Sequence, residues 1–247
     1  MTENQRPEEV VLSAVDLVAG YIPEVNILNG CTAHVGRAEL VGIIGPNGAG
    51  KSTLIKAMFG LVPVTEGKVL LRDKDITALP AHGMVSEGIG YVPQNNNVFP
   101  SLTVHENLEM GMYLRPKEFD QRLAVVSEIF PLLSERSAQK CGSLSGGERQ
   151  VVAMGRALMT DPAVLLLDEP SAGPSPLMQD AVFESVQKIN QSGVSILMVE
   201  QNATQCLEIA HRAYVLDQGR NAYTGTGQEL LHDPKVIELY LGTLARI

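Results

Sequence analysis

A glycine-rich stretch that ends in lysine and serine is the part of this sequence that points most clearly to chemistry. Residues 45–52 read GPNGAGKS, which has the spacing G-x-x-x-x-G-K-S. In such a loop the backbone N–H groups surround the α- and β-phosphates of a nucleotide, Lys51 reaches the β- and γ-phosphate oxygens, and Ser52 ligates Mg²⁺. We therefore predict a phosphate-binding loop made of Gly45, Pro46, Asn47, Gly48, Ala49, Gly50, Lys51, Ser52 and Thr53.

The flanks of this loop favour that interpretation over a simple glycine-rich surface turn. Before the loop, residues 40–44 form a continuous apolar run that is typical of a buried strand. After it, apolar residues recur at helical spacing at Leu54, Ile55, Met58 and Phe59. The motif needs a strand, a loop and a helix in this order, because the positive N-terminal end of the helix attracts the phosphates.

Two adjacent carboxylates follow a second apolar run. Residues 164–167 are Val-Leu-Leu-Leu, and Asp168 and Glu169 come directly after them. A buried strand that ends here places both carboxylates at the C-terminal edge of the sheet, where α/β folds bind ligands. We expect Asp168 to hold Mg²⁺ and Glu169 to orient or deprotonate the attacking water. The alternative is a strand that merely ends in an acidic turn, which the phosphate loop in the same chain makes less favoured.

The hydrophobic pattern around these residues predicts an alternation of strands and helices. Strands are expected over residues 10–17, 31–35, 39–44, 67–71, 88–92, 163–167, 194–199, 213–216 and 221–224. Helices are expected over 52–60, 77–87 with Thr77 as the cap, 118–133, 145–161, 179–191, 202–211 and 229–241, and after a capping box at Thr103 and Glu106. Apolar strands joined by helices predict an α/β fold with a parallel sheet, into which a helical block at about 95–145 is inserted.

Length and composition restrict the class of protein. A chain of 247 residues, 45% hydrophobic and 19% charged, is an ordinary globular protein that we treat as one domain over 1–247. The net charge of −9 argues against non-specific nucleic-acid binding, because that needs a basic surface. Residues 1–9 are polar and no apolar run has the length of a membrane span, so we expect neither a signal peptide nor a transmembrane helix. The three cysteines and five histidines have no metal-binding or redox spacing.

The most specific string in the chain is LSGGERQ at residues 144–150. Ser145, Gly146 and Gly147 at the start of a helix predict a second anion site, by the same logic as the phosphate loop. The first loop is already a complete cradle for one set of phosphates. A second anion site is therefore useful if it serves a nucleotide held by another subunit.

In their order and spacing, residues 45–52, 144–150 and 164–169 resemble the nucleotide-binding subunit of an ATP-binding-cassette (ABC) transporter. The resemblance covers nearly the whole chain. It implies a P-loop NTPase (RecA-like) core with a parallel sheet, an N-terminal antiparallel β subdomain and an inserted α-helical subdomain. It also implies an ATPase that works as a head-to-tail dimer. Two ATP molecules with Mg²⁺ would lie between the phosphate loop of one subunit and the LSGGE string of the other.

The resemblance gives roles to further positions. Gln94 corresponds to a glutamine that senses Mg²⁺ and the γ-phosphate and belongs with the metal site. Tyr21 corresponds to an aromatic that stacks on adenine, although its residue type alone equally fits a packed aromatic at a strand end. Residues 171–176 correspond to a loop that touches the opposite subunit. Lys51, Glu169 and Gln201 correspond to the catalytic positions.

Two positions depart from the usual pattern of the family. Ser175 stands where an Asp is common, and Gln201 stands where a histidine is usual. A glutamine donates and accepts hydrogen bonds but carries no proton at neutral pH. The site would thus be impaired if it relied on histidine protonation, and unimpaired if the residue only positions phosphate and water. The same Glu-Gln-Asn string is familiar from one branch of the family.

That branch is the second ATPase subunit of branched-chain amino-acid importers, with relatives for neutral amino acids and for urea or short amides. The matching segments are 92–94, 98–104, 168–171 and 199–202. The implied partners are integral-membrane permease subunits, a second ABC ATPase subunit and, indirectly, a periplasmic substrate-binding protein. The implied location is the cytoplasmic face of the inner membrane, as a peripheral subunit. Residues 96–102 would receive a helix of the permease, because Val98 and Phe99 would otherwise be exposed apolar residues.

Two alternatives share the catalytic motifs. One is a soluble ABC ATPase of iron–sulfur assembly, which is also a single cassette. The other is the ATPase subunit of a lipid exporter. Gln201 and residues 100–104 favour the importer over the exporter.

Overall fold

The computed structural model of the chain describes residues 9–95, 97–174 and 176–241. It contains two sheets. The six-stranded sheet has the order β10-β9-β3-β8-β7-β6, and the four-stranded sheet has the order β2-β1-β4-β5. The strands of the larger sheet are β3 (Leu40–Ile44), β6 (Ile89–Val92), β7 (Val164–Asp168), β8 (Ser195–Val199), β9 (Arg212–Asp217) and β10 (Arg220–Thr226). Those of the smaller sheet are β1 (Val10–Ala19), β2 (Leu28–Gly36), β4 (Val64–Leu71) and β5 (Lys74–Asp75).

The six-stranded sheet confirms the predicted parallel core. Strands β6, β7, β8, β3 and β9 pair in parallel, and only the hairpin partner β10 is antiparallel. All five residues of β3, β7 and β8 are buried. These strands are continuous apolar runs because helices cover both faces of a parallel sheet. Their carboxyl ends meet at one edge of the sheet, and that edge carries the residues discussed below.

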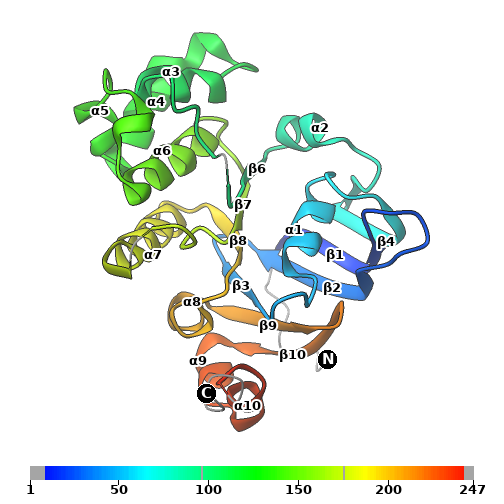
Figure 1. Cartoon of the computed structure of the whole chain (residues 1–247). Helices are drawn as coiled ribbons and strands as arrows, with labels where there is room; N and C mark the ends of the chain where they lie inside the picture. The colour runs from blue at the N-terminus through cyan, green and yellow to red at the C-terminus, as the bar shows by residue number, and fades with distance from the viewer. Residues whose placement is uncertain (1–8, 96, 175, 242–247) are drawn as a thin grey trace.

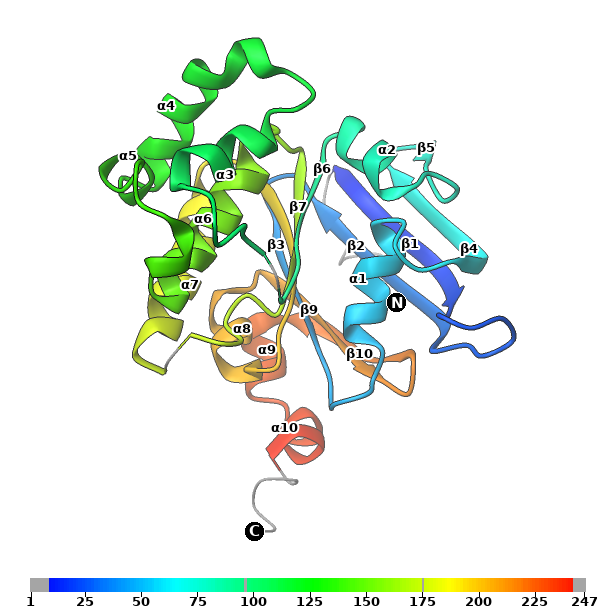
Figure 2. The same ribbon diagram turned by 45° about the horizontal axis from the view of Figure 1, so that its top comes forward.

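The helix that follows the phosphate loop lies between the two sheets (Figures 1 and 2). Helix α1 (Lys51–Met58) packs against β1 and β2 on one side and against β7 and β8 on the other. Leu54, Ile55 and Met58 are fully buried in the cluster that joins the sheets. Burial on two sides fixes the direction of α1, and therefore fixes where its N-terminus points.

The middle of the chain forms a separate helical block, which Figure 2 shows on the other side of β7 from α1. Its helices are α3 (Val104–Gly111), α4 (Phe119–Ile129), α5 (Leu132–Glu135) and α6 (Gly146–Leu158). The predicted capping box is present: the Thr103 side chain accepts from the Glu106 N–H, and the Glu106 carboxylate accepts from the Thr103 N–H. The remaining helices are α2 (Ala81–Ser86), α7 (Pro176–Gln191), α8 (Ala203–Ile209), α9 (Gly227–Leu231) and α10 (Pro234–Leu241). The fold class is therefore as predicted from the motifs.

Four local predictions were wrong. The single helix predicted over 118–133 is two helices, because α4 ends at Ile129 and α5 begins only after Pro131. Thr77 does not cap a helix, because its hydroxyl donates to Asp75 and accepts from the N–H of Val69, and α2 starts only after Pro80. The single helix predicted over 229–241 is two helices, since Pro234 begins α10. Val98 was expected to be exposed, but it is only 8% exposed and belongs to the core beneath the helical block. Phe99, expected to be exposed as well, is 44% exposed.

No described helix is both long and apolar enough to cross a membrane. Cys31, Cys141 and Cys206 are buried free thiols. No group of three or more metal-binding His, Cys, Asp or Glu side chains lies together in the described ranges.

Candidate active site

The phosphate loop lines a pocket at the carboxyl end of β3. The pocket has a volume of about 290 Å³ and is lined by Ile27, Asn47, Gly48, Ala49, Gly50, Lys51, Ser52, Thr53 and Glu169. Gly48 and Gly50 have φ of +81° and +97°, conformations that side chains other than glycine rarely adopt. The loop can therefore turn its backbone N–H groups inward only because glycine stands at both positions.

The N-terminus of α1 is open to an anion. Gly50 occupies the N-cap position, no side chain caps the helix, and no acidic residue lies in its first turn. The first N–H groups of a helix have no partner within the helix, and together they carry about half a positive charge. A phosphate is thus a suitable ligand for this end of α1.

Lys51 places its ammonium inside the loop. It is 5% exposed, and its Nζ donates to the carbonyl oxygens of Gly45 at 2.6 Å and Pro46 at 3.2 Å. Burial lowers the pKa of Lys51, and the nearby carboxylates of Glu169, Asp168 and Glu200 oppose that shift. The bonds to neutral carbonyls leave the positive charge available to a bound anion.

Asp168, the last residue of β7, has one carboxylate oxygen without a partner. Its side chain is 1% exposed; Oδ2 accepts from the Tyr91 hydroxyl at 3.2 Å and lies 3.6 Å from Lys56 Nζ. The other oxygen, Oδ1, is buried and has no hydrogen-bond partner among the described residues. A buried carboxylate oxygen left unpaired is costly unless it binds something. This donor fits a hard divalent cation such as Mg²⁺, which takes oxygen ligands.

Glu169 and Gln94 meet at the edge of this pocket. Gln94 Nε2 donates to Glu169 Oε2 at 2.7 Å, although the two residues are 75 positions apart. The backbone of Glu169 has φ of +48°, which is unusual for a residue other than glycine, and its N–H donates to the carbonyl of Val199. The neighbouring strand β8 thus holds the backbone in a conformation that turns the side chain toward the phosphate loop.

Gln201 also reaches the phosphate loop. Its Nε2 donates to Asn47 Oδ1 at 3.2 Å, across 154 positions in sequence. Gln201 is the second residue after the end of β8, which pairs with β3, the strand that precedes the phosphate loop. The structure therefore brings Gln94, Glu169 and Gln201 to the loop that contains Lys51 and Ser52.

Tyr21, Ser145, Gly146 and Gly147 were predicted to contact nucleotide, and all four lie outside this pocket. Tyr21 is 53% exposed and does not line the pocket, where Ile27 of the same connection between β1 and β2 is found instead. Ser145 is the N-cap of α6, in a capping box with Glu148. The Gly146 position faces Pro174, and Gly147 is in close contact with Met178 of α7. None of these three residues of the LSGGE string lines the phosphate pocket of its own chain.

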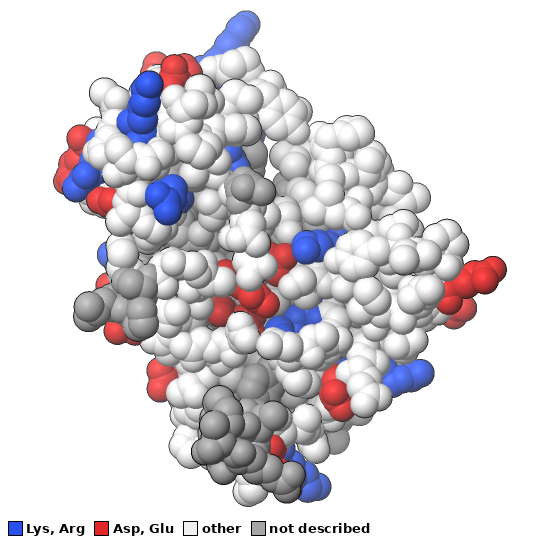
Figure 3. Space-filling model, viewed as in Figure 1, with Lys and Arg blue, Asp and Glu red and all other residues white. Residues whose placement is uncertain are grey.

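Acidic and basic side chains lie next to one another at the centre of the face shown in Figure 3, with mostly uncharged surface around them. The charged residues that line the pocket are Lys51 and Glu169. A phosphate-binding loop with the carboxylates Asp168 and Glu169 and the amides of Gln94 and Gln201 is the arrangement expected for nucleotide hydrolysis.

Comparison with known proteins assigns the family. The protein-family model described as ABC transporter matches residues 28–172, which is more than half of the chain. The chain belongs to the ABC transporter family. It is an ATPase subunit of the ABC type.

Relatives match this ABC ATPase over nearly its full length. The high-affinity branched-chain amino acid transport ATP-binding protein BraG of Pseudomonas aeruginosa is 41% identical, covering 92% of this chain and 98% of BraG. The probable branched-chain amino acid transport ATP-binding protein LivF of Archaeoglobus fulgidus is 43% identical, covering 94% and 99%. The lipopolysaccharide export ATP-binding protein LptB of Escherichia coli is 34% identical, covering 94% and 97%.

Solved structures agree with the fold. A nucleotide-free ATP-binding cassette from an ABC transporter superposes with a TM-score of 0.81 at 31% identity, covering 94% of this chain and 98% of that one. The ADP conformation of another cassette gives a TM-score of 0.82 at 30% identity, covering 94% and 99%.

The structure adds site residues that the sequence did not single out in this ABC ATPase. Tyr91 and Lys56 both approach Asp168, and Glu200 accepts hydrogen bonds from the loop that follows Glu169. A weak signal existed for each. Lys56 is on the helix that the loop opens, Tyr91 is on the strand before Gln94, and Glu200 is a carboxylate directly after an apolar strand. None of these signals was specific enough to indicate a partner.

Proposed function

We propose that this chain is the ATP-hydrolysing subunit of an importer for branched-chain or neutral amino acids. The observation that supports hydrolysis best is the site itself, where Glu169 lines the pocket of the phosphate loop and the preceding Asp168 has a buried, unpaired Oδ1. The names of BraG and LivF, at 41% and 43% identity, support amino-acid import over the export function named for LptB at 34%. Import of urea or short amides stays an alternative within the same branch.

In this proposal the phosphate loop binds the phosphates of ATP, and a second set of residues binds Mg²⁺. The N–H groups of residues 45–53 and the Lys51 ammonium would bind the β- and γ-phosphates of ATP. Ser52, Asp168 and Gln94 would hold Mg²⁺, which when bound neutralises negative charge on the phosphates. The buried position of Asp168 and the carboxylate contact of Gln94 are consistent with these roles.

Glu169 and Gln201 would position the water that attacks the γ-phosphate. The Glu169 carboxylate accepts a hydrogen bond from Gln94 and can accept one from a water that attacks the γ-phosphate. Gln201, already bonded to Asn47, would orient that water and the phosphate without exchanging a proton. Lys51 would stabilise the charge that develops on the transferred phosphoryl group.

A second ATPase subunit is part of the proposal. Ser145, Gly146 and Gly147 do not line the pocket of their own chain, so we assign them to the nucleotide held by the partner subunit. Residues 171–176 would contact the same partner; Ser175 lies outside the described residues. The exposed Tyr21 would stack on adenine once ATP is bound.

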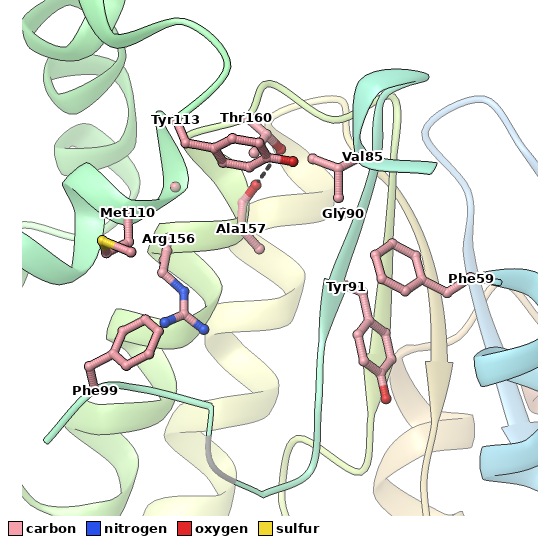
Figure 4. A pocket seen from close by; sticks show the side chains of 11 residues that line it. Phe59, Val85, Gly90, Tyr91, Phe99, Met110, Tyr113, Arg156, Ala157 and Thr160 are labelled. Atoms are coloured by element: carbon pink, nitrogen blue, oxygen red, sulfur yellow. Dashed lines mark hydrogen bonds between the residues drawn. The ribbon is translucent and has the colours of Figure 1, made fainter. Parts of the chain in front are cut away.

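A groove beside the helical block is suited to a membrane permease. It has a volume of about 250 Å³, and its lining includes Phe99, Met110, Tyr113 and Arg156. Phe99, Met110 and Tyr113 are 44%, 52% and 57% exposed, and the Arg156 guanidinium lies 5.1 Å from the centre of the Phe99 ring (Figure 4). Exposed aromatic and methionine side chains around a hollow are typical of a protein interface. Of the predicted docking segment 96–102, Phe99 lines this groove and the Asn97 carbonyl accepts from Arg156, while Asn96 lies outside the described residues.

The proposed assembly combines these surfaces with the resemblance to amino-acid importers. Permease subunits would dock in the groove, a second ABC ATPase would complete the nucleotide sites, and a periplasmic binding protein would deliver the substrate to the permease. The chain would then be a peripheral subunit on the cytoplasmic face of the inner membrane. Co-purification with integral-membrane proteins would support this, whereas co-purification with a soluble iron–sulfur scaffold would contradict it.

The substitution Glu169→Gln tests the hydrolytic role. The variant keeps the size of the side chain but cannot accept a proton from water, so we expect hydrolysis to fall by about 100-fold or more while ATP binding is retained. ATP binding is measured by a thermal shift and hydrolysis by phosphate release. Glu118→Gln, at an exposed carboxylate paired with Arg115, is the matched control and should hydrolyse ATP normally. A Glu169→Gln variant with wild-type turnover would remove Glu169 from the mechanism.

A further inference from the structure

Glu200 is a buried carboxylate that no motif explains. It directly follows β8 and is 1% exposed. No ion pair to a lysine, arginine or histidine is found for it within the described ranges. A buried charge without a countercharge is costly, so its hydrogen bonds must compensate.

The donors that satisfy Glu200 come from two different loops. Oε1 accepts from the backbone N–H of Ser171 at 2.9 Å, and Oε2 accepts from the Ser171 hydroxyl at 2.8 Å. Oε2 also accepts from the backbone N–H of Gln201 at 3.1 Å. Burial raises the pKa of Glu200, and the hydrogen bonds from Ser171, Gln201 and Asn202 oppose that rise. One side chain thus bonds to the loop after Glu169 and to the loop of Gln201.

These contacts continue to the phosphate loop. Ser171 is two residues from Glu169, and Gln201 donates from its side chain to Asn47 at 3.2 Å. The path from Ser171 through Glu200 and Gln201 to Asn47 is therefore made of direct hydrogen bonds. A displacement of the loop at Ser171 moves the acceptor that holds the backbone of Gln201.

We infer that Glu200 is a positioning residue, whose carboxylate holds the loop after Glu169 and the loop of Gln201 as one unit beside the phosphate loop. The inference rests on the proposed function in one respect, because residues 171–176 are there assigned to the contact with a second subunit. Through Glu200, that contact would set the orientation of Gln201. Glu200 itself does not line the phosphate pocket.

A carboxylate suits position 200 because an ionised carboxylate only accepts hydrogen bonds. Donors from Ser171, Gln201 and Asn202 converge on two oxygens, and an ionised carboxylate can accept from all of them. The isosteric substitution Glu200→Gln would turn an NH₂ group toward at least one of these donors, which leaves that donor unpaired. The variant therefore loosens both loops with little change in volume.

Hydrogen–deuterium exchange of the full chain tests the link without depending on hydrolysis. Glu200→Gln should raise exchange together in residues 170–174 and 200–203, by about tenfold at the affected amides, the factor that corresponds to one buried charged hydrogen bond. Glu106→Gln is the matched control, since the Glu106 carboxylate also accepts from a backbone N–H and a hydroxyl, both of Thr103, but belongs to α3 in the helical block. It should leave exchange in these two segments unchanged. A rise confined to 200–203 in Glu200→Gln would overturn the inference.

Ser171→Ala is the second variant, in case Glu200→Gln does not fold. It removes one hydroxyl from the first loop and should raise exchange in 200–203, a segment that contains no mutated residue. No change in 200–203 would overturn the inference.

Kinetics of the assembled transporter test the positioning role. Glu200→Gln should lower kcat by about tenfold with KM for ATP within about twofold of wild type, because ground-state binding is left intact. Added to Gln201→Ala, it should cause little further loss, since Glu200 is inferred to act through Gln201. Additive losses, or a loss confined to KM, would overturn the inference. Absence of ATP hydrolysis in the wild-type assembly would instead overturn the proposed function, and the exchange result would still decide the role of Glu200.

Discussion

The two edges of the six-stranded sheet both bury charged side chains, and they treat them differently. Arg212 begins β9 at the amino edge, and Asp168 ends β7 at the carboxyl edge. Both are almost inaccessible, at 5% and 2% exposure. At the amino edge Arg212 and Glu39 form an ion pair, whereas at the carboxyl edge Asp168 has one oxygen that accepts no hydrogen bond from the described residues.

The amino edge joins the two sheets. Arg212 donates to both oxygens of Glu39 at 2.9 Å, to the Tyr214 hydroxyl at 2.7 Å and to the carbonyl of His34 at 2.9 Å. His34 belongs to β2 of the antiparallel sheet, while Arg212 and Tyr214 belong to β9 of the parallel sheet. The planar guanidinium suits this fork-like pairing, and its charge is neutralised within the protein. This network is a structural joint.

At the carboxyl edge the same kinds of group remain available to a ligand. Asp168 Oδ1 has no partner among the described residues, and Lys51 bonds to two neutral carbonyls of its own loop. Glu169 bonds to the neutral amide of Gln94. Buried charges that satisfy one another stabilise a fold, whereas buried charges with unused capacity mark a site that binds charged ligands.

The largest expected effect is at the amino edge. Arg212→Met removes the countercharge of Glu39, whose side chain is only 15% exposed, so we expect the free energy of unfolding to fall by about 3–5 kcal/mol. Chemical denaturation of the nucleotide-free chain measures it. The control is Arg37→Met, at an exposed pair with Glu9, where the loss should stay within about 0.5 kcal/mol. If the two variants lost equal stability, the amino edge would not be the joint described here.

The opposite result is expected for Asp168→Asn at the carboxyl edge. The substitution removes a buried charge whose Oδ1 is unpaired, so the nucleotide-free chain should keep or gain stability in the same denaturation assay. Hydrolysis should fall by about 100-fold or more, because the proposed metal ligand is weakened. Loss of stability as large as that of Arg212→Met would mean that Asp168 is structural, and the comparison between the two edges would fail.

A smaller effect is expected for Tyr91→Phe. The variant removes the hydroxyl that donates to Asp168 but keeps the ring that stacks on Phe59 with centroids 4.8 Å apart. Because one hydrogen bond to a proposed metal ligand is lost, the apparent affinity for Mg²⁺ should fall by about tenfold, with little change in stability. A Mg²⁺ titration of the ATP-induced thermal shift measures this. An unchanged Mg²⁺ dependence would show that Lys56 alone suffices to hold Asp168 Oδ2.

Local signals predicted most of the elements. The apolar runs of β3, β7 and β8 and the capping box at Thr103 and Glu106 depend on neighbours within a few residues, and the structure has them as predicted. Where local signals competed, the prediction failed. Thr77 has a good residue type for a cap, but a tertiary position beside Val69 and Asp75 uses its hydroxyl. Val98 looked exposed in an asparagine-rich loop, but the helical block covers it.

The sequence by itself determined that this chain binds phosphate, because the glycine loop is a short-range device whose chemistry is complete in residues 45–53. Its strings also determined the family. Only the tertiary structure decided which distant side chains share the site, since Gln94 meets Glu169 across 75 positions and Gln201 meets Asn47 across 154. It also decided that one carboxylate oxygen of Asp168 has no partner among the described residues, whereas both carboxylate oxygens of Glu39 accept hydrogen bonds from Arg212. Residue type fixes what a carboxylate can accept, but only packing decides which donors reach it.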